Sequence, residues 1–135
     1  MTVLEFLRQP QMASVQIEYC LTEMQRWDDL AYRIAENADT QSQEAKKKLA
    51  EAVGFCMGME ADISDLVKRL AEVKKQTTEK ILMLDNPMEQ RVLLKRHIHG
   101  KSLQEIADDL DKSYENVKTI HKRGVKHLQE VLCGQ

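Results

Sequence analysis

The chain has 135 residues, of which 42% are hydrophobic, 31% are charged and only 4% are aromatic. This length allows one domain or two very small ones, and high charge with few aromatic residues suits long, exposed helices. Five glycines and two prolines leave few helix breakers, and no alternating run of strand length occurs. These features predict an all-α protein.

The cysteines and the apolar segments bear on the compartment. Cys20, Cys56 and Cys133 form an odd set without paired spacing, and the first residues lack the basic-then-apolar pattern of a signal peptide. No segment reaches the roughly 20 apolar residues that a membrane-spanning helix needs. We therefore expect a protein of a reducing cytoplasm that makes no membrane contact.

The net charge of −2 is distributed unevenly. Residues 1–85 hold 11 Lys and Arg against 15 Asp and Glu, whereas residues 86–135 hold 9 against 7. Within 112–128 there are five basic residues and one acidic residue. Such a local excess attracts phosphate groups, although a solvated helix face would show the same composition.

Two long helices are predicted in the N-terminal part. From Ile17 to Ala38, and again from Ala45 to Thr77, apolar or small residues recur at alternating steps of three and four, which is the pattern of a heptad seam. We expect a helix over about 12–38 to pack antiparallel against the first part of a helix over 42–84. The last four turns of the second helix then remain free to meet the C-terminal part or another subunit.

Polar residues separate the two runs, and Thr40 followed by Gln43 is expected to cap the second helix. Gly54 and Gly58 lie inside that helix, where each costs about 1 kcal/mol relative to Ala. Small residues four positions apart also let another backbone approach closely. We interpret the pair as a close-packing spot, with a kink as the alternative.

Three shorter helices are predicted after residue 85. The first begins at Pro87, because Asn86 is a good N-cap and Glu89 completes a capping box, and it ends at Gly100, which can take a left-handed conformation. Ser102 and Ser113 then open two more helices, over about 103–110 and 114–131.

The last two helices have the spacing of a helix-turn-helix. Two helices that cross steeply over a short turn need a small residue at the crossing and a shared apolar face, and Ala107 is that small residue. Asp111 stands where the turn often has Gly. The apolar positions that the motif requires are filled by Ile106, Leu110, Val117 and Ile120.

The outward side of the last helix carries the candidate DNA-contacting residues. Lys and Arg contact phosphates or guanine edges, Glu accepts from the cytosine amine, and a helix N-terminus favours a phosphate. The alternative is a solvated amphipathic helix that ends a bundle. The candidates are Ser113, Tyr114, Glu115, Lys118, Thr119, Lys122 and Arg123.

Residues from about 81 to 132 resemble region 4 of sigma-70-type RNA polymerase sigma factors, the module that reads the −35 promoter element. The likeness runs through RVLLKRHIHGKSLQEIA and SYENVKTIHKRGVKHL, in which Gly124 stands at a position usually held by Ala. The whole chain is similar to small phage and prophage transcriptional regulators of the ArpU type. The resemblance implies a bacterial host cell, promoter-type DNA recognition by the helix from Tyr114, and contact with RNA polymerase.

No enzyme, metal site or cofactor is predicted. The chain has no Gly-rich phosphate loop, nucleophile elbow or HExxH pattern, and the adjacent Asp108 and Asp109 point in different directions on a helix. His97 and His99 lack a Cys pair or carboxylate at ligand spacing. We expect His97 to be a ring packed beside the turn.

The leading hypothesis is a DNA-binding transcriptional regulator. Residues 1–84 form a helical hairpin for homodimerisation or partner binding, and residues 85–135 form the helix-turn-helix domain that binds double-stranded DNA. Two alternatives stay open, namely a DNA-packaging component resembling a small terminase subunit and a structural helical adaptor. A ring of eight or more subunits would favour the packaging component. The absence of salt-dependent binding to duplex DNA would favour the structural adaptor.

Overall fold

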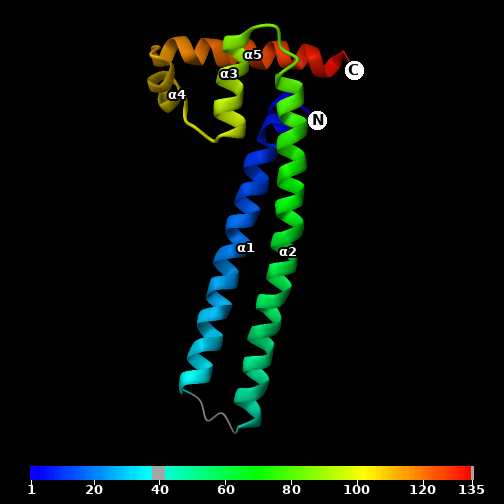
Figure 1. Ribbon diagram of the computed structural model, residues 1–135, viewed down its shortest axis with the longest axis vertical. Helices are drawn as coiled ribbons and strands as arrows, with labels where there is room; N and C mark the ends of the chain where they lie inside the picture. Colours follow the sequence, from blue (N-terminus) through cyan, green and yellow to red (C-terminus); the bar gives the residue numbers. More distant parts are fainter. Residues whose placement is uncertain (38–41, 135) are drawn as a thin grey trace. The chain divides into compact units, whose positions relative to one another are not determined.

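The computed structural model describes residues 1–37 and 42–134, and within these ranges the chain is all-α (Figure 1). This confirms the predicted fold class, a long N-terminal helix pair followed by a C-terminal helical module. None of the helices in the described part has the length and apolar content that crossing a bilayer requires. The elements are α1 (Val3–Asn37), α2 (Gln43–Ile81), α3 (Pro87–Leu93), the π-helical turn η1 (Leu94–Ile98), α4 (Leu103–Leu110) and α5 (Tyr114–Cys133).

Residue contacts divide the chain into two units. The helix-turn-helix unit consists of Met1–Met12 together with Leu70–Gln135, and the hairpin unit consists of Ala13–Arg69. Each long helix therefore belongs to both units, because the beginning of α1 and the end of α2 pack with the C-terminal helices.

Helix α1 begins at Val3, and the prediction of a start near residue 12 was wrong. Thr2 Oγ1 accepts the Glu5 N–H, and the Glu5 carboxylate accepts the Thr2 N–H, each over 3.1 Å. This capping box pairs N–H groups that a helix start otherwise leaves unsatisfied. Pro10 lies inside the helix and is buried. Because proline usually interrupts a helix, the sequence pattern did not predict the turns before it.

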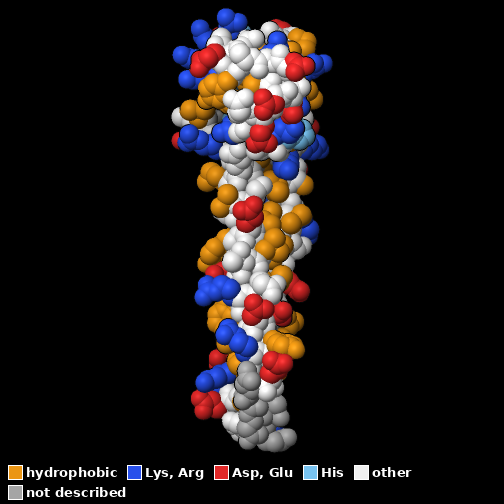
Figure 2. Space-filling view, turned by 90° about the vertical axis from the view of Figure 1, so that its left-hand side faces the viewer, with side chains coloured by type: hydrophobic (Ala, Val, Ile, Leu, Met, Phe, Trp, Pro, Cys, Tyr) orange, Lys and Arg blue, Asp and Glu red, His pale blue; other side chains and the backbone are white. Residues whose placement is uncertain are grey.

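In the hairpin unit the predicted seam is confirmed. The seam positions of α1 from Ile17 to Ile34 and of α2 from Ala45 to Leu66 are all less exposed than most of their neighbours. Of the described residues in this unit, only Ala13 and Ala52 are buried, because two helices cannot cover a seam on every side. Figure 2 shows hydrophobic side chains between charged ones along the hairpin surface.

Contacts between α1 and α2 hold the hairpin in antiparallel order (Figure 1). The rings of Trp27 and Phe55 stack with centroids 4.3 Å apart and an interplanar angle of 11°. The Cys56 thiol donates to the Met24 carbonyl over 3.7 Å. The expected cap at Thr40 lies outside the described residues, and the first turn of α2 is capped by Ser42, whose Oγ accepts the Ala45 N–H at 3.4 Å.

Gly54 and Gly58 lie on an open surface of α2. A Cβ atom added at either glycine would meet no heavy atom of the described residues within 4 Å. Within a single chain, the prediction of a close-packing spot is therefore wrong. Helix α2 also continues without interruption from Gln43 to Ile81.

The helix-turn-helix unit contains two clusters of buried side chains. The first joins the beginning of α1 and the end of α2 to α3 and α5. The second lies between α3, α4 and α5. Burying one Leu, Ile or Val side chain contributes about 1.5–3 kcal/mol. The first cluster comprises Leu7, Ile81, Leu84, Leu93 and Leu128. The second comprises Val92, Ile106, Ala107 and Val117.

Candidate nucleic-acid interface

The crossing of α4 and α5 has the packing that a helix-turn-helix requires. Ala107 is 1% exposed, and Ile106 and Val117 are fully buried beside it. A larger side chain at position 107 would push the helices apart. Leu110 and Ile120 pack against the same cluster, so the predicted small residue and all four apolar positions are confirmed.

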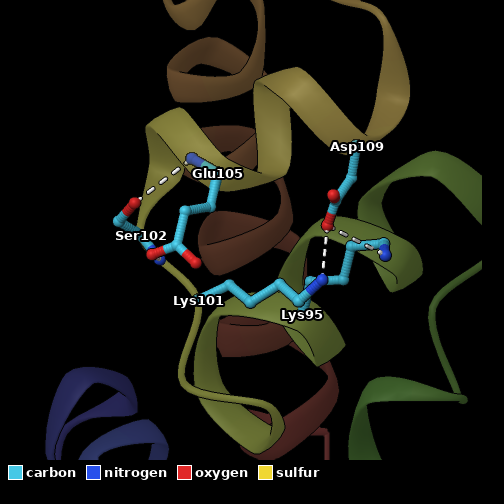
Figure 3. A network of polar contacts seen from close by, with 5 residues as sticks. All are labelled: Lys95, Lys101, Ser102, Glu105 and Asp109. Atoms are coloured by element: carbon cyan, nitrogen blue, oxygen red, sulfur yellow. Dashed lines mark hydrogen bonds and ion pairs between the residues drawn. The ribbon is translucent and has the colours of Figure 1, made fainter.

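Side-chain caps fix the start of both helices. Ser102 Oγ accepts the Glu105 N–H at 3.2 Å, and the Glu105 carboxylate accepts the Ser102 N–H at 3.2 Å (Figure 3). Ser113 Oγ accepts the Asn116 N–H at 3.1 Å. Between the helices, Asp111 takes the left-handed conformation with φ 54° and ψ 43°. The chain therefore turns sharply and leaves the first turn of α5 open to solvent.

An ion-pair cluster attaches α4 to the residues before it (Figure 3). Asp109 Oδ2 lies 2.5 Å from Lys101 Nζ and 3.6 Å from Lys95 Nζ. The hydrogen bond from Lys101 lowers the pKa of Asp109, and the same bond raises the pKa of Lys101. These two lysines are thus engaged within the protein, in contrast to the basic residues of α5.

The predicted DNA-contacting residues lie together on the open side of α5. All seven, from Ser113 to Arg123, are exposed. Helical spacing places Glu115, Lys118 and Lys122 on the side away from the buried Val117. Thr119 lies on that side too, but its hydroxyl donates to the Glu115 carbonyl over 2.9 Å. Ser113 and Thr119 therefore already use their hydroxyl groups within the protein.

Lys126 extends this basic surface, although sequence reasoning did not include it among the candidates. It is exposed and follows Lys122 by four positions, so it lies one turn further along the same side. Four basic residues of α5 have no ion-pair partner among the described residues: Lys118, Lys122, Arg123 and Lys126. Four unpaired positive charges on one helix attract a phosphate backbone. The i, i+4 spacing was the signal that could have found Lys126.

Gly124 sets the distance between α5 and α3. It is buried, and an added Cβ would stand 3.2 Å from Leu93 Cδ1 and 3.4 Å from Glu89 Cβ. The Glu89 carboxylate turns toward α5, where Oε1 lies 2.5 Å from His127 Nδ1. In the predicted capping box only the Asn86 half therefore forms, in which Asn86 Oδ1 accepts the N–H groups of Met88 and Glu89. The Glu89 carboxylate is used by His127 instead.

A second contact links the π-helical turn η1 to α5. His97 is 8% exposed, and its Nε2 lies 2.9 Å from His121 Nε2. Burial, followed by the charges of His121 and Arg96, lowers the pKa of His97 to about 4. Burial, followed by Arg96, also lowers the pKa of His121. At neutral pH both rings are uncharged, and one ring nitrogen donates to the other.

The packing of α4 and α5, with an open basic surface on the second helix, defines a helix-turn-helix DNA-binding module. Residues 86–130 match the family model described as Sigma-70, region 4. Over 44 residues, the chain is 43% identical to the RNA polymerase sigma factor SigO of Bacillus subtilis (strain 168). That match covers 33% of this chain and only 25% of the length of the relative. No solved structure matches the chain.

This C-terminal segment is therefore a sigma-70 region 4-like helix-turn-helix, as its sequence predicted. The resemblance of the whole chain to phage regulators stays a prediction.

Proposed function

We propose that the protein is a transcriptional regulator that binds promoter DNA with the outer side of α5. One observation carries this proposal: a sigma-70 region 4-like helix-turn-helix presents Lys118, Lys122 and Arg123 exposed and without ion-pair partners among the described residues. In a helix-turn-helix the second helix enters the major groove with its N-terminal residues toward the base edges. The open surface of α5 is the surface that such docking would place against DNA.

The positions along α5 suggest how the contacts are divided. Glu115 and Lys118 lie in the first turns, where a cytosine amine and a guanine edge would be within reach. Lys122, Arg123 and Lys126 lie further along and would contact phosphates, which position the protein without reading sequence.

The N-terminal end of α5 adds two further groups. Free N–H groups of its first turn, beside the Ser113 cap, would hold another phosphate. Tyr114 is 41% exposed and flanks the helix entry. We assign it a contact with the sugar-phosphate backbone.

We further propose that this is a regulator of the phage or prophage type that contacts RNA polymerase. The sequence resemblance supports both points, and the name of the Bacillus subtilis relative supports the second. We propose residues 85–135 as the DNA-binding domain and residues 1–84 as the part that mediates homodimerisation. A cytoplasmic location fits a DNA-binding module.

The test is selection of genomic fragments from the host or prophage by the full chain at two salt concentrations, followed by sequencing. We expect a few intergenic fragments to survive the higher salt. Lys118→Glu combined with Lys122→Glu should abolish the enrichment, whereas the charge-matched control Lys46→Glu with Lys75→Glu, at exposed positions of α2, should preserve it.

Two results would contradict the proposal. Enrichment that survives the double substitution in α5 would exclude this recognition surface. The absence of any salt-resistant fragment with the unmodified protein would favour a packaging component or a structural adaptor.

A further inference from the structure

The outer side of α2 in the hairpin unit holds an open groove with a volume of about 460 Å³. We infer that this groove binds a basic amphipathic helix of another protein, which lies along α2 with two apolar side chains on the groove floor and a Lys or Arg at each end. The inference depends neither on DNA binding nor on homodimerisation. The groove is lined by Glu51, Gly54, Phe55, Gly58, Met59 and Asp62.

Two glycines one helical turn apart leave the floor of the groove without side chains. Both are exposed, and a Cβ atom added at Gly54 or Gly58 would meet no heavy atom of the described residues within 4 Å. Glycine destabilises a helix interior relative to Ala, and no contact within the described part of the chain compensates for this. A second helix in the groove would compensate, because its apolar side chains can reach the α2 backbone there.

An aromatic ring forms one wall of the groove. Phe55 is 50% exposed, and its ring is held in position by the stack on Trp27. A ring that is already fixed loses little conformational freedom when a partner covers it. Rigid aromatic side chains beside a cavity are typical anchor points of protein interfaces. The groove therefore offers a preformed apolar surface next to its open floor.

Carboxylates stand at both ends of the groove. Glu51 and Asp62 are exposed, and they lie on the same side of α2, about 16.5 Å apart along the helix axis. Neither has an ion-pair partner among the described residues. Both negative charges are thus available to groups that enter the groove from outside.

The acidic character extends beyond these two carboxylates. Residues 49–67 of α2 hold four acidic residues and no Lys, Arg or His. The facing part of α1, residues 13–31, also holds four acidic residues, and its one basic residue, Arg26, is paired with Glu23 over 2.9 Å. Burial, followed by the charges of Asp28 and Glu60, raises the pKa of the Cys56 thiol. The middle of the hairpin therefore attracts a cationic partner.

The same charges disfavour α2 of a second copy as the occupant. If two α2 helices packed antiparallel about their glycines, Glu51 of one copy would lie near Asp62 of the other. If they packed parallel and in register, each carboxylate would face its own equivalent. Like charges meet in both arrangements, whereas a helix with a Lys or Arg at each end gives both carboxylates an opposite charge. Homodimerisation would then use another face of the helices.

The spacing within the groove defines the sequence pattern of the partner. A helix must run along the groove to reach both carboxylates, since a helix that crosses α2 steeply would contact one end alone. Side chains on one face of a helix recur at steps of three and four. The partner therefore carries a Lys or Arg, an apolar residue four positions later, a second apolar residue after three more, and a second Lys or Arg after a further four.

The test is titration of the full chain with a synthetic helical peptide of the pattern Arg-xxx-Leu-xx-Leu-xxx-Arg, in which x is Ala or Gln. Trp27 is the only tryptophan in the sequence and stacks on the groove-lining Phe55, so its fluorescence reports occupation of the groove. We expect saturable binding with a change in Trp27 emission. A peptide of the same composition, with both Arg on the opposite helix face, should bind at least tenfold more weakly.

Substitutions at the two ends of the groove test the charge contacts. Glu51→Gln with Asp62→Asn should weaken binding of the Arg peptide at least tenfold. The matched control, Glu36→Gln with Asp85→Asn at exposed positions outside the groove, should preserve it. Glu51→Lys with Asp62→Lys should instead bind a peptide in which Glu replaces both Arg.

Substitutions on the floor test the shape of the groove. Gly54→Leu with Gly58→Leu should weaken binding of the Arg peptide at least tenfold by filling the floor. The leucines have open space in the single chain and favour helix, so circular dichroism should show an unchanged fold. Ala35→Leu with Ala50→Leu, at exposed positions outside the groove lining, is the matched control and should bind normally.

Three results would overturn the inference. The first is the absence of saturable binding between the unmodified chain and the Arg peptide. The second is equal binding of that peptide by the unmodified chain and by Glu51→Gln with Asp62→Asn. The third is a self-associated chain that the peptide separates into monomers in sedimentation equilibrium, which would assign the groove to a second copy.

Discussion

The two units of the chain bury their hydrophobic side chains to very different extents. In the helix-turn-helix unit, two clusters of buried residues lie among five helical segments, and side chains cap the helices. Among the hairpin residues that the structure describes, two alanines alone are buried, and large apolar residues such as Tyr19 and Phe55 remain exposed. The first unit packs its core within a single chain, whereas the second leaves large apolar side chains exposed.

The largest difference between the units should appear in core truncations. Leu128 is fully buried in the first cluster, and Leu128→Ala should lower the free energy of unfolding by about 2–5 kcal/mol through lost burial and a residual cavity. Leu66 is only half-buried on the seam, so Leu66→Ala should cost clearly less. Urea unfolding followed by circular dichroism measures both. Equal decreases in the free energy of unfolding for the two variants would show that the hairpin seam is packed as tightly as the core of the helix-turn-helix unit.

Acidification should weaken the helix-turn-helix unit through His97. Its pKa is about 4 in the folded protein, against 6.5 for the free side chain. Between these values the unfolded chain binds a proton that the folded chain does not, so the free energy of unfolding falls as the pH falls through this window. The full loss is up to about 3 kcal/mol, and the contribution is complete above pH 6.5.

Urea unfolding at pH 7 and pH 4.5 measures this dependence. His97→Phe, which cannot titrate, should show a smaller loss of stability over the interval than the unmodified protein. The same loss in both proteins would assign the pH dependence to other groups.

Helix caps should give a smaller contrast. Ser113→Ala removes a cap bond of 3.1 Å at the start of α5 and should cost about 1 kcal/mol. Ser42→Ala removes a longer bond of 3.4 Å at the start of α2, and we expect a cost below that of Ser113→Ala. Thermal unfolding of both variants provides the comparison, and a larger effect at Ser42 would reverse the ranking.

Local patterns allowed much of this structure to be predicted. Heptad steps predicted both long helices, and the cap residues Asn86, Ser102 and Ser113 predicted the starts of α3, α4 and α5. The spacing around Ala107 placed the turn at Asp111, and the structure adds that Asp111 takes the left-handed conformation there. Each of these features depends on residues within a few positions of one another.

The contacts that escaped prediction join distant parts of the chain. His97 meets His121, and Glu89 meets His127, over separations that leave no periodic signal. The residues of the π-helical turn that contains His97 show no spacing that distinguishes it from an ordinary α-helix. The packing of Leu7 into the C-terminal core was missed because Pro10 obscured the first turns of α1.

The most direct test of the central claim is the salt dependence of DNA binding by the open side of α5. Fluorescence anisotropy with a selected fragment would give the slope of the logarithm of the binding constant against the logarithm of the salt concentration. Replacing Lys122 and Lys126, the two lysines assigned to phosphates, by Ala should reduce the magnitude of that slope by about 2, since each phosphate contact contributes about 0.9. An unchanged slope together with unchanged affinity would show that α5 does not contact the DNA.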